Sequence, residues 1–158
     1  MHSSVIEWVG AMVNLYSLST IRTLELGSRD LNGSVRPMFD GEYVGVDLVK
    51  GPGVDLVMDG AALDFPDSHF DLVVSTSHLE HDRTFWLTLR EVARVLRPGG
   101  FFILTSVADF HIHNRPDYWR FLPDTWPLLM GMAECELLNS RDDPKHAGPQ
   151  LLGRRREA

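Results

Sequence analysis

The sequence has one cysteine, Cys135, and no apolar run of the about 18 residues that a membrane-spanning helix requires. A single cysteine excludes an internal disulfide, so the chain is not a small secreted scaffold stabilised by cystines. The N-terminus also lacks the basic segment followed by an apolar segment that marks a secretory signal. We therefore expect a cytoplasmic protein that has no membrane partner.

Basic residues are also scarce. Lys and Arg number 15 against 22 Asp and Glu, which gives a formal net charge of −7, and the one basic run is Arg154–Arg156. Proteins that bind nucleic acid usually carry a basic stripe, so we expect no direct nucleic-acid binding. The 158 residues, of which 44% are hydrophobic, suit one domain over residues 1–158 with a single core. The sequence indicates no particular oligomeric state.

Three segments place apolar residues at helical spacing. Ser4 and Glu7, near the start of the first segment, are spaced as a capping box. Asp82 is placed to cap the second segment, and Arg97–Gly100 is expected to end it and to turn the chain into a strand. We predict helices over Ser3–Ser17, Phe85–Leu96 and Pro123–Met132.

Strands are predicted where short apolar runs lie between glycine, proline and polar residues. The first five such runs alternate with helical or irregular segments, which is typical of a parallel α/β sheet layered by helices. The last two are predicted to form a closing antiparallel pair. The predicted strands are Ile21–Leu26, Tyr43–Leu48, Val54–Met58, Phe70–Ser75, Phe101–Thr105, Glu134–Ser140 and Pro149–Arg156.

Three features follow the first three strands. Gly27 ends the first strand, Asp47 the second and Asp59 the third. Ligands of open α/β sheets bind beyond the carboxyl ends of the strands, so these residues are expected to share one site. Glycine allows a ligand to approach the backbone, Asp47 is placed to accept hydrogen bonds from a ribose diol, and Asp59 from an adenine amine. The pattern favours an adenosine pocket.

Two adenosine ligands are candidates, a nicotinamide dinucleotide and S-adenosylmethionine. Dinucleotide sites normally carry Gly-x-Gly-x-x-Gly leading into a full helix. Gly27–Asn32 does not match this pattern, and Asp30 would face the phosphates with the wrong charge. An NAD-dependent oxidoreductase is therefore the weaker alternative.

Several segments, in the same order and spacing, make the sequence similar to class I S-adenosylmethionine-dependent methyltransferases of the small, type 11-like group. The resemblance implies a Rossmann-like doubly wound sheet, mostly parallel, closed by an antiparallel strand pair, with helices on both faces. The chain departs from the family pattern at Arg29 and Leu31, where glycines are common. The similar segments are Leu24–Arg29, Tyr43–Asp47, Phe65–Asp67, Phe70–Ser75, Leu79–His81 and Glu91–Gly100.

The resemblance also implies roles for individual residues around the cofactor. Asp47 binds the ribose hydroxyls with Leu48 against the adenine, and Asp59 and Gly60 flank the adenine amine. The residues implied at the methionine end of S-adenosylmethionine are Glu25, Gly27, Ser75 and Thr76, and Ser28 and Arg29 are implied as further cofactor-binding residues.

Methyl transfer requires mainly that donor and acceptor are held in line, with a general base if the acceptor is a hydroxyl. Histidine titrates closest to neutral pH. We name His113, in a segment that borders the acceptor pocket in similar proteins, and His81 as the candidates, ahead of His78 and His111. No metal is expected, because the His111–His113 pair with Asp109 does not define a ligand set.

The sequence thus predicts methyl transfer from S-adenosylmethionine to a small-molecule acceptor. The main alternative is a non-catalytic binding or assembly module that keeps the methyltransferase fold.

Overall fold

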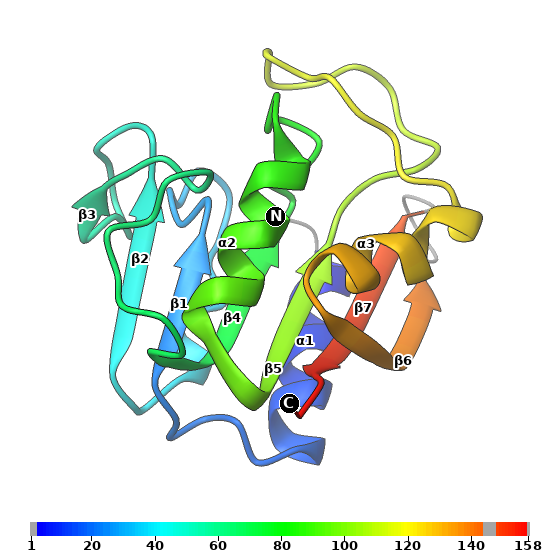
Figure 1. The fold of residues 1–158 in the computed structure, drawn as a ribbon. Coiled ribbons are helices and arrows are strands. Elements are labelled where there is room, and N and C mark those ends of the chain that lie inside the picture. Colours follow the sequence, from blue (N-terminus) through cyan, green and yellow to red (C-terminus); the bar gives the residue numbers. More distant parts are fainter. Residues whose placement is uncertain (1–2, 144–147, 158) are drawn as a thin grey trace.

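The computed structural model describes residues 3–143 and 148–157. Within them, seven strands form one sheet in the order β3-β2-β1-β4-β5-β7-β6 (Figure 1). The strands β1 to β5 are parallel, and β7 is antiparallel to both β5 and β6. The strands are β1 (Thr23–Leu26), β2 (Tyr43–Asp47), β3 (Leu56–Val57), β4 (Phe70–Thr76), β5 (Leu96–Thr105), β6 (Cys135–Asp142) and β7 (Pro149–Arg155).

Helices cover both faces of this sheet, as predicted (Figure 1). Helix α1 (Ser3–Leu15) packs against side chains such as Leu72, Val74 and Ile103 on one face. Helices α2 (Phe85–Val95) and α3 (Trp126–Met132) pack against the other face, where alternate residues of the same strands point. The mostly parallel Rossmann-like sheet with its closing antiparallel pair is therefore confirmed. Two 3₁₀ turns, Arg36–Met38 and Pro123–Thr125, complete the elements.

The predicted cap of the first helix is wrong. Ser4 lies inside α1, and its hydroxyl donates a hydrogen bond to Asp143 Oδ2 at 2.8 Å instead of capping the helix with Glu7. The helix ends at Leu15, two residues earlier than predicted, because Ser17 has a positive φ of 56°. The N-terminal helix is thus linked to the end of β6 by a long-range contact that no local pattern reveals.

The Arg97–Gly100 turn is also placed differently from the prediction. These residues belong to β5, because Leu96 already pairs with Phe70 while Phe101 pairs with Leu72. Four residues on β5 therefore lie opposite one residue on β4, which makes a large bulge. Gly99 has a φ of 72°, a conformation that glycine adopts readily. The helix stops at Val95, but the chain enters the sheet at once.

Other predicted boundaries differ because tertiary contacts decide where ladders and helices end. Asp82 does not precede α2 directly; Thr84 does, and Asp82 accepts hydrogen bonds from the Thr84 N–H at 2.8 Å and the Thr88 hydroxyl. Strand β3 has two residues where five were predicted, and both are exposed at the sheet edge. The predicted helix from Pro123 begins as a 3₁₀ turn.

The carboxyl ends of the parallel strands all lie at one edge of the sheet, and the long segment after β5 passes over this edge (Figure 1). No helix within residues 3–143 and 148–157 is long and apolar enough to cross a bilayer.

Candidate active site

A cavity of about 1150 Å³ lies at the carboxyl edge of the sheet. Its walls are the turns after β1 and β2, the segment after β3, the turn after β4 and the loop after β5. Five segments that are far apart in the sequence thus meet around one space, as expected for a ligand site of an α/β sheet.

The turn after β1 requires glycine at residue 27 for two separate reasons. Gly27 has a φ of 70°, which strains residues that carry a Cβ. A Cβ at this position would also lie 2.8 Å from the His78 side chain. The turn continues to Gly33, whose φ is 108° and whose N–H donates to Asp30 Oδ1 at 2.8 Å. Asp30 is therefore used to shape this turn.

The carboxylates after β2 and β3 are held by neighbouring backbone N–H groups. Asp47 accepts hydrogen bonds from Val49 at 2.9 Å and from Arg29 at 3.4 Å. Asp59 accepts one from Ala61 at 2.8 Å. An ionised carboxylate has about four acceptor positions, so both side chains keep acceptor capacity for a ligand. Both line the cavity.

The structure brings most of the predicted cofactor residues together. Three do not line the cavity: Glu25, Ser28 and Ser75. Ser28 is buried against Gly45, and the Ser75 hydroxyl lies 3.2 Å from His78 Nδ1. The predicted residues that line it are Gly27, Arg29, Asp47, Leu48, Asp59, Gly60 and Thr76.

His78 lines the cavity and lies between Gly27 and Ser75. Burial lowers the pKa of its imidazole, which keeps the ring neutral at physiological pH. The sequence suggested His78 only as a minor candidate for the base. Its contact with Gly27 joins the ends of two different strands, β4 and β1, so the sequence pattern does not reveal it.

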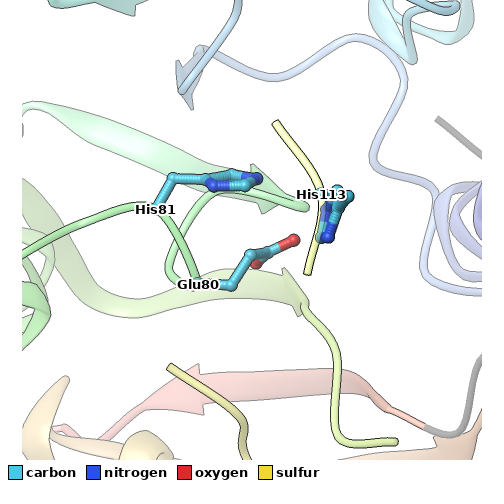
Figure 2. A group of neighbouring side chains, drawn as sticks. All are labelled: Glu80, His81 and His113. Atoms are coloured by element: carbon cyan, nitrogen blue, oxygen red, sulfur yellow. The ribbon is translucent and has the colours of Figure 1, made fainter. Parts of the chain in front are cut away.

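The part of the cavity between the turn after β4 and the loop after β5 holds a group of three side chains, Glu80, His81 and His113 (Figure 2). One donor atom of each lies within 4.8 Å of the others. The His81 and His113 rings pack edge to face with centroids 5.0 Å apart. Glu80 has no exposed surface and was not predicted as a site residue. Its signal in the sequence is its place in the Leu79–His81 segment, which resembles the methyltransferase family.

The loop after β5 is held over the cavity by several hydrogen bonds. The Tyr118 N–H donates to the Glu80 carbonyl at 2.7 Å, and Trp119 Nε1 donates to the Asp82 carbonyl at 2.8 Å. Arg120 donates to both oxygens of Asp117, at 2.6 and 2.8 Å, and this lowers the pKa of that buried carboxyl well below its usual range. Asp117 Oδ2 in turn accepts the His113 N–H at 2.9 Å. These bonds place His113 beside His81.

The other candidates in this loop do not join the group. Asp109 and His111 are exposed, and within the described part of the chain neither shares a donor cluster with His113.

Comparison with known proteins decides the family. A family model described as a methyltransferase domain matches residues 32–104. A fatty-acid O-methyltransferase from Mycolicibacterium smegmatis is 37% identical over 114 residues, which cover 71% of this chain and 36% of that protein. The chain belongs to the class I S-adenosylmethionine-dependent methyltransferases. It spans about a third of the length of this curated relative.

Solved structures have the same fold as this chain. One is the 1,6-didemethyltoxoflavin-N1-methyltransferase of Burkholderia thailandensis, solved with 1,6-didemethyltoxoflavin and S-adenosylhomocysteine. Its superposition gives a TM-score of 0.78 at 19% identity and includes 97% of this chain and 79% of that protein chain. The [4+2]-cyclase SpnF gives 0.74 at 16% identity, with coverages of 94% and 81%.

Arg29, one of the two residues that depart from the glycine-rich pattern, has an exposed side chain directed to the segment after β2. A Cβ on Gly51 would lie 3.0 Å from Arg29 Nε. The Arg29 N–H still donates to Asp47, so the turn after β1 and the end of β2 remain linked. Leu31 is exposed and lines the cavity.

Glu25 lies on the α1 side of β1, because its neighbours Leu24 and Leu26 point to the α2 side. The residue is 2% exposed, and Glu25 Oε2 has no hydrogen-bond partner among the described residues. Burial raises the pKa of the Glu25 carboxyl to about 7, while the Tyr43 hydroxyl and the Arg36 guanidinium oppose the shift. Glu25 is therefore a buried acid behind the cavity wall.

The Glu25→Gln variant is expected to remove a pH-dependent part of stability. The folded-state pKa is raised from 4.5 to about 7, so the protonated form stabilises the fold in full below about pH 4.5, and this contribution is lost as pH rises through about 7. Relative to the variant, the free energy of unfolding of the wild type should fall by up to about 3 kcal/mol over this range. Urea unfolding of both proteins at several pH values measures the difference. An exposed control, Glu7→Gln, should show no such trend, and a pH-independent difference for Glu25→Gln would contradict the assignment.

Proposed function

We propose that this methyltransferase binds S-adenosylmethionine and transfers its methyl group to a small-molecule acceptor. The observation that carries the proposal is the continuous cavity, which joins the Gly27, Asp47 and Asp59 strand ends to the end that holds His81 and His113. Its volume of about 1150 Å³ exceeds the roughly 300–1000 Å³ of most small-molecule sites, which leaves room for donor and acceptor together.

The cofactor half is proposed to lie over β1, β2 and β3. Asp47 would accept hydrogen bonds from the ribose hydroxyls, with Leu48 against the adenine and Asp59 and Gly60 near the adenine amine. Gly27 and Thr76 would border the methionine end. The neutral His78 beside Gly27 supports this orientation, because an imidazolium there would repel the sulfonium cation.

The acceptor half is proposed to lie under the loop after β5. His81 Nδ1 lies 2.7 Å from the Pro116 carbonyl, which can only accept, so that nitrogen carries the proton and Nε2 keeps its lone pair. His113 Nδ1 similarly faces the His111 carbonyl at 3.3 Å. Either Nε2 could take the proton of an acceptor hydroxyl. The relatives named above support a small acceptor, since their names specify a fatty acid and 1,6-didemethyltoxoflavin.

Calorimetry with S-adenosylmethionine, S-adenosylhomocysteine and NAD tests the cofactor. We expect saturable binding of both adenosyl compounds and none of NAD. Binding of NAD alone would overturn the proposal and revive the oxidoreductase alternative.

Release of S-adenosylhomocysteine from pooled small metabolites tests the reaction. Once an acceptor is identified, His113→Ala is expected to lower turnover by about 100-fold or more if His113 is the base. An unchanged rate removes His113 from that role.

A second candidate function is binding without methyl transfer. The turn after β1 favours this candidate, because Arg29 and Leu31 stand there at positions where the family commonly has glycine. Tight binding of S-adenosylhomocysteine with no turnover of any pooled metabolite would favour this candidate.

A further inference from the structure

Three side chains with metal-binding donor atoms lie close together in the acceptor end of the cavity: Glu80, His81 and His113. Glu80 and His81 come from the turn after β4, and His113 comes from the loop after β5. Figure 2 shows the Glu80 carboxylate and the His81 ring directed toward the His113 ring. The donor atoms lie within 4.8 Å of one another. The three residues line the same cavity but have no part in the proposed cofactor half.

Each imidazole is oriented so that one nitrogen remains available. His81 Nδ1 donates to the Pro116 carbonyl at 2.7 Å. His113 Nδ1 lies 3.3 Å from the His111 carbonyl and 3.3 Å from Asp117 Oδ2, and Asp117 is fixed by Arg120. Metal-binding histidines usually donate their second ring N–H to a carbonyl or carboxylate in this way, which fixes the tautomer and directs the other nitrogen to the metal.

Glu80 supplies the observation that most favours a cation. Its side chain is fully buried, Glu80 Oε2 accepts a hydrogen bond from the Ser106 hydroxyl at 2.6 Å, and Glu80 Oε1 has no partner among the described residues. A buried carboxylate oxygen without a donor is costly, since it has lost water and gained nothing in exchange. A cation coordinated by Oε1 would satisfy it.

We propose that Glu80, His81 and His113 form a binding site for a divalent transition metal ion of the Zn²⁺ class. Two imidazoles and one carboxylate are a ligand set that Zn²⁺ and its first-row neighbours accept, whereas Mg²⁺ and Ca²⁺ prefer oxygen ligands alone. Ligand atoms of a tetrahedral Zn²⁺ site lie about 3.3 Å apart, so side-chain rotations that close the group by about 1.5 Å would complete the site.

Three protein ligands leave at least one coordination position open toward the cavity. An acceptor oxygen bound there would be acidified by the metal, and the two imidazoles would then serve as ligands and not as bases. This consequence rests on the proposed function. The metal binding itself does not.

Titration of untagged protein, freed of metal by a chelator, with Zn²⁺ in a calorimeter tests the proposal. Titration with Co²⁺ adds the visible absorption of its d–d bands, which reports the ligand geometry. We expect one ion per chain, and binding about 100-fold weaker or lost in His113→Ala and in Glu80→Gln.

Two histidine variants serve as controls. His69→Gln, at the far end of β4, is expected to leave Zn²⁺ affinity within about 3-fold of the wild type, because its ring stacks on Phe65 away from the cavity. His111→Ala should do the same, although His111 neighbours His113. An equal loss of binding in His111→Ala would overturn the ligand set proposed here.

The proposal is also overturned if the wild type binds no Zn²⁺, or binds it with unchanged affinity in His113→Ala. Circular dichroism of each variant separates loss of the site from loss of the fold, and His113→Ala, in a loop, covers the case in which Glu80→Gln does not fold. Calorimetry with S-adenosylhomocysteine, run with and without Zn²⁺, keeps the two proposals apart: metal binding without adenosyl binding would contradict the proposed function alone, and the reverse result would contradict the metal site alone.

Discussion

Replacing Asp47 by alanine is expected to weaken the binding of S-adenosylhomocysteine by at least about 100-fold. Two charge-assisted hydrogen bonds to a ribose diol contribute roughly 1.5–3 kcal/mol each, and alanine removes both. The Asp47 carboxylate is already oriented by the N–H groups of Val49 and Arg29, so it needs little reorganisation to bind. Calorimetry of the variant against the wild type measures the loss.

Two further substitutions sharpen this test. Asp47→Asn keeps one acceptor oxygen and loses the charge, so we expect an intermediate affinity, roughly 10-fold below that of the wild type. Asp64→Ala removes an exposed carboxylate that does not line the cavity and should leave the affinity unchanged. Unaltered affinity in a folded Asp47→Ala protein would show that the adenosyl ligand does not use the end of β2.

Replacing Gly27 by alanine is expected to lower the free energy of unfolding by about 2–5 kcal/mol. The left-handed φ of 70° strains a residue with a Cβ by about 1–2 kcal/mol. The added methyl group would lie 2.8 Å from the His78 side chain, and relieving this contact costs about 1–3 kcal/mol more. Urea unfolding followed by circular dichroism measures the change.

The chain offers a matched control and a way to separate the two causes. Gly131 lies in α3, and a Cβ added there would meet no atom within 4 Å, so Gly131→Ala should be neutral or stabilise the protein by up to about 1 kcal/mol. In a His78→Gly background, which removes both the ring and the Cβ that the new methyl group would contact, Gly27→Ala should lose its steric cost and keep its backbone strain. A Gly27→Ala protein as stable as the wild type would contradict both causes.

Local patterns were sufficient for the elements that are long or strongly periodic. The apolar run of Phe70–Thr76 and the helical spacing of Phe85–Val95 depend on neighbours in the sequence, so both were predicted nearly to their ends. The short edge strand Leu56–Val57 was predicted too long, because only pairing with β2 decides how many residues join the ladder. The bulge at Arg97–Gly100 likewise depends on its partner strand β4.

The pattern of apolar residues in the sequence did not predict the direction in which buried side chains point. Strand β1 is buried on both faces, so its continuous burial does not tell which residues point to the cavity side. Glu25 and Ser75 were predicted beside the cofactor on the resemblance, yet neither lines the cavity. Their roles toward the cofactor stay predictions, as does the extent of the domain over residues 1–158.

The sequence by itself determined the α/β class, the succession of strands along the chain and the strand ends that carry Gly27, Asp47 and Asp59. These follow from periodicity and from turn chemistry, which act over a few residues. Only the tertiary structure decided that His78 fills the space beside Gly27 and that His113 reaches Glu80 and His81. The reason is that these contacts join loops that are far apart in the sequence, whose separation in space is set by how β4 and β5 pair and by the hydrogen bonds of the loop over the cavity.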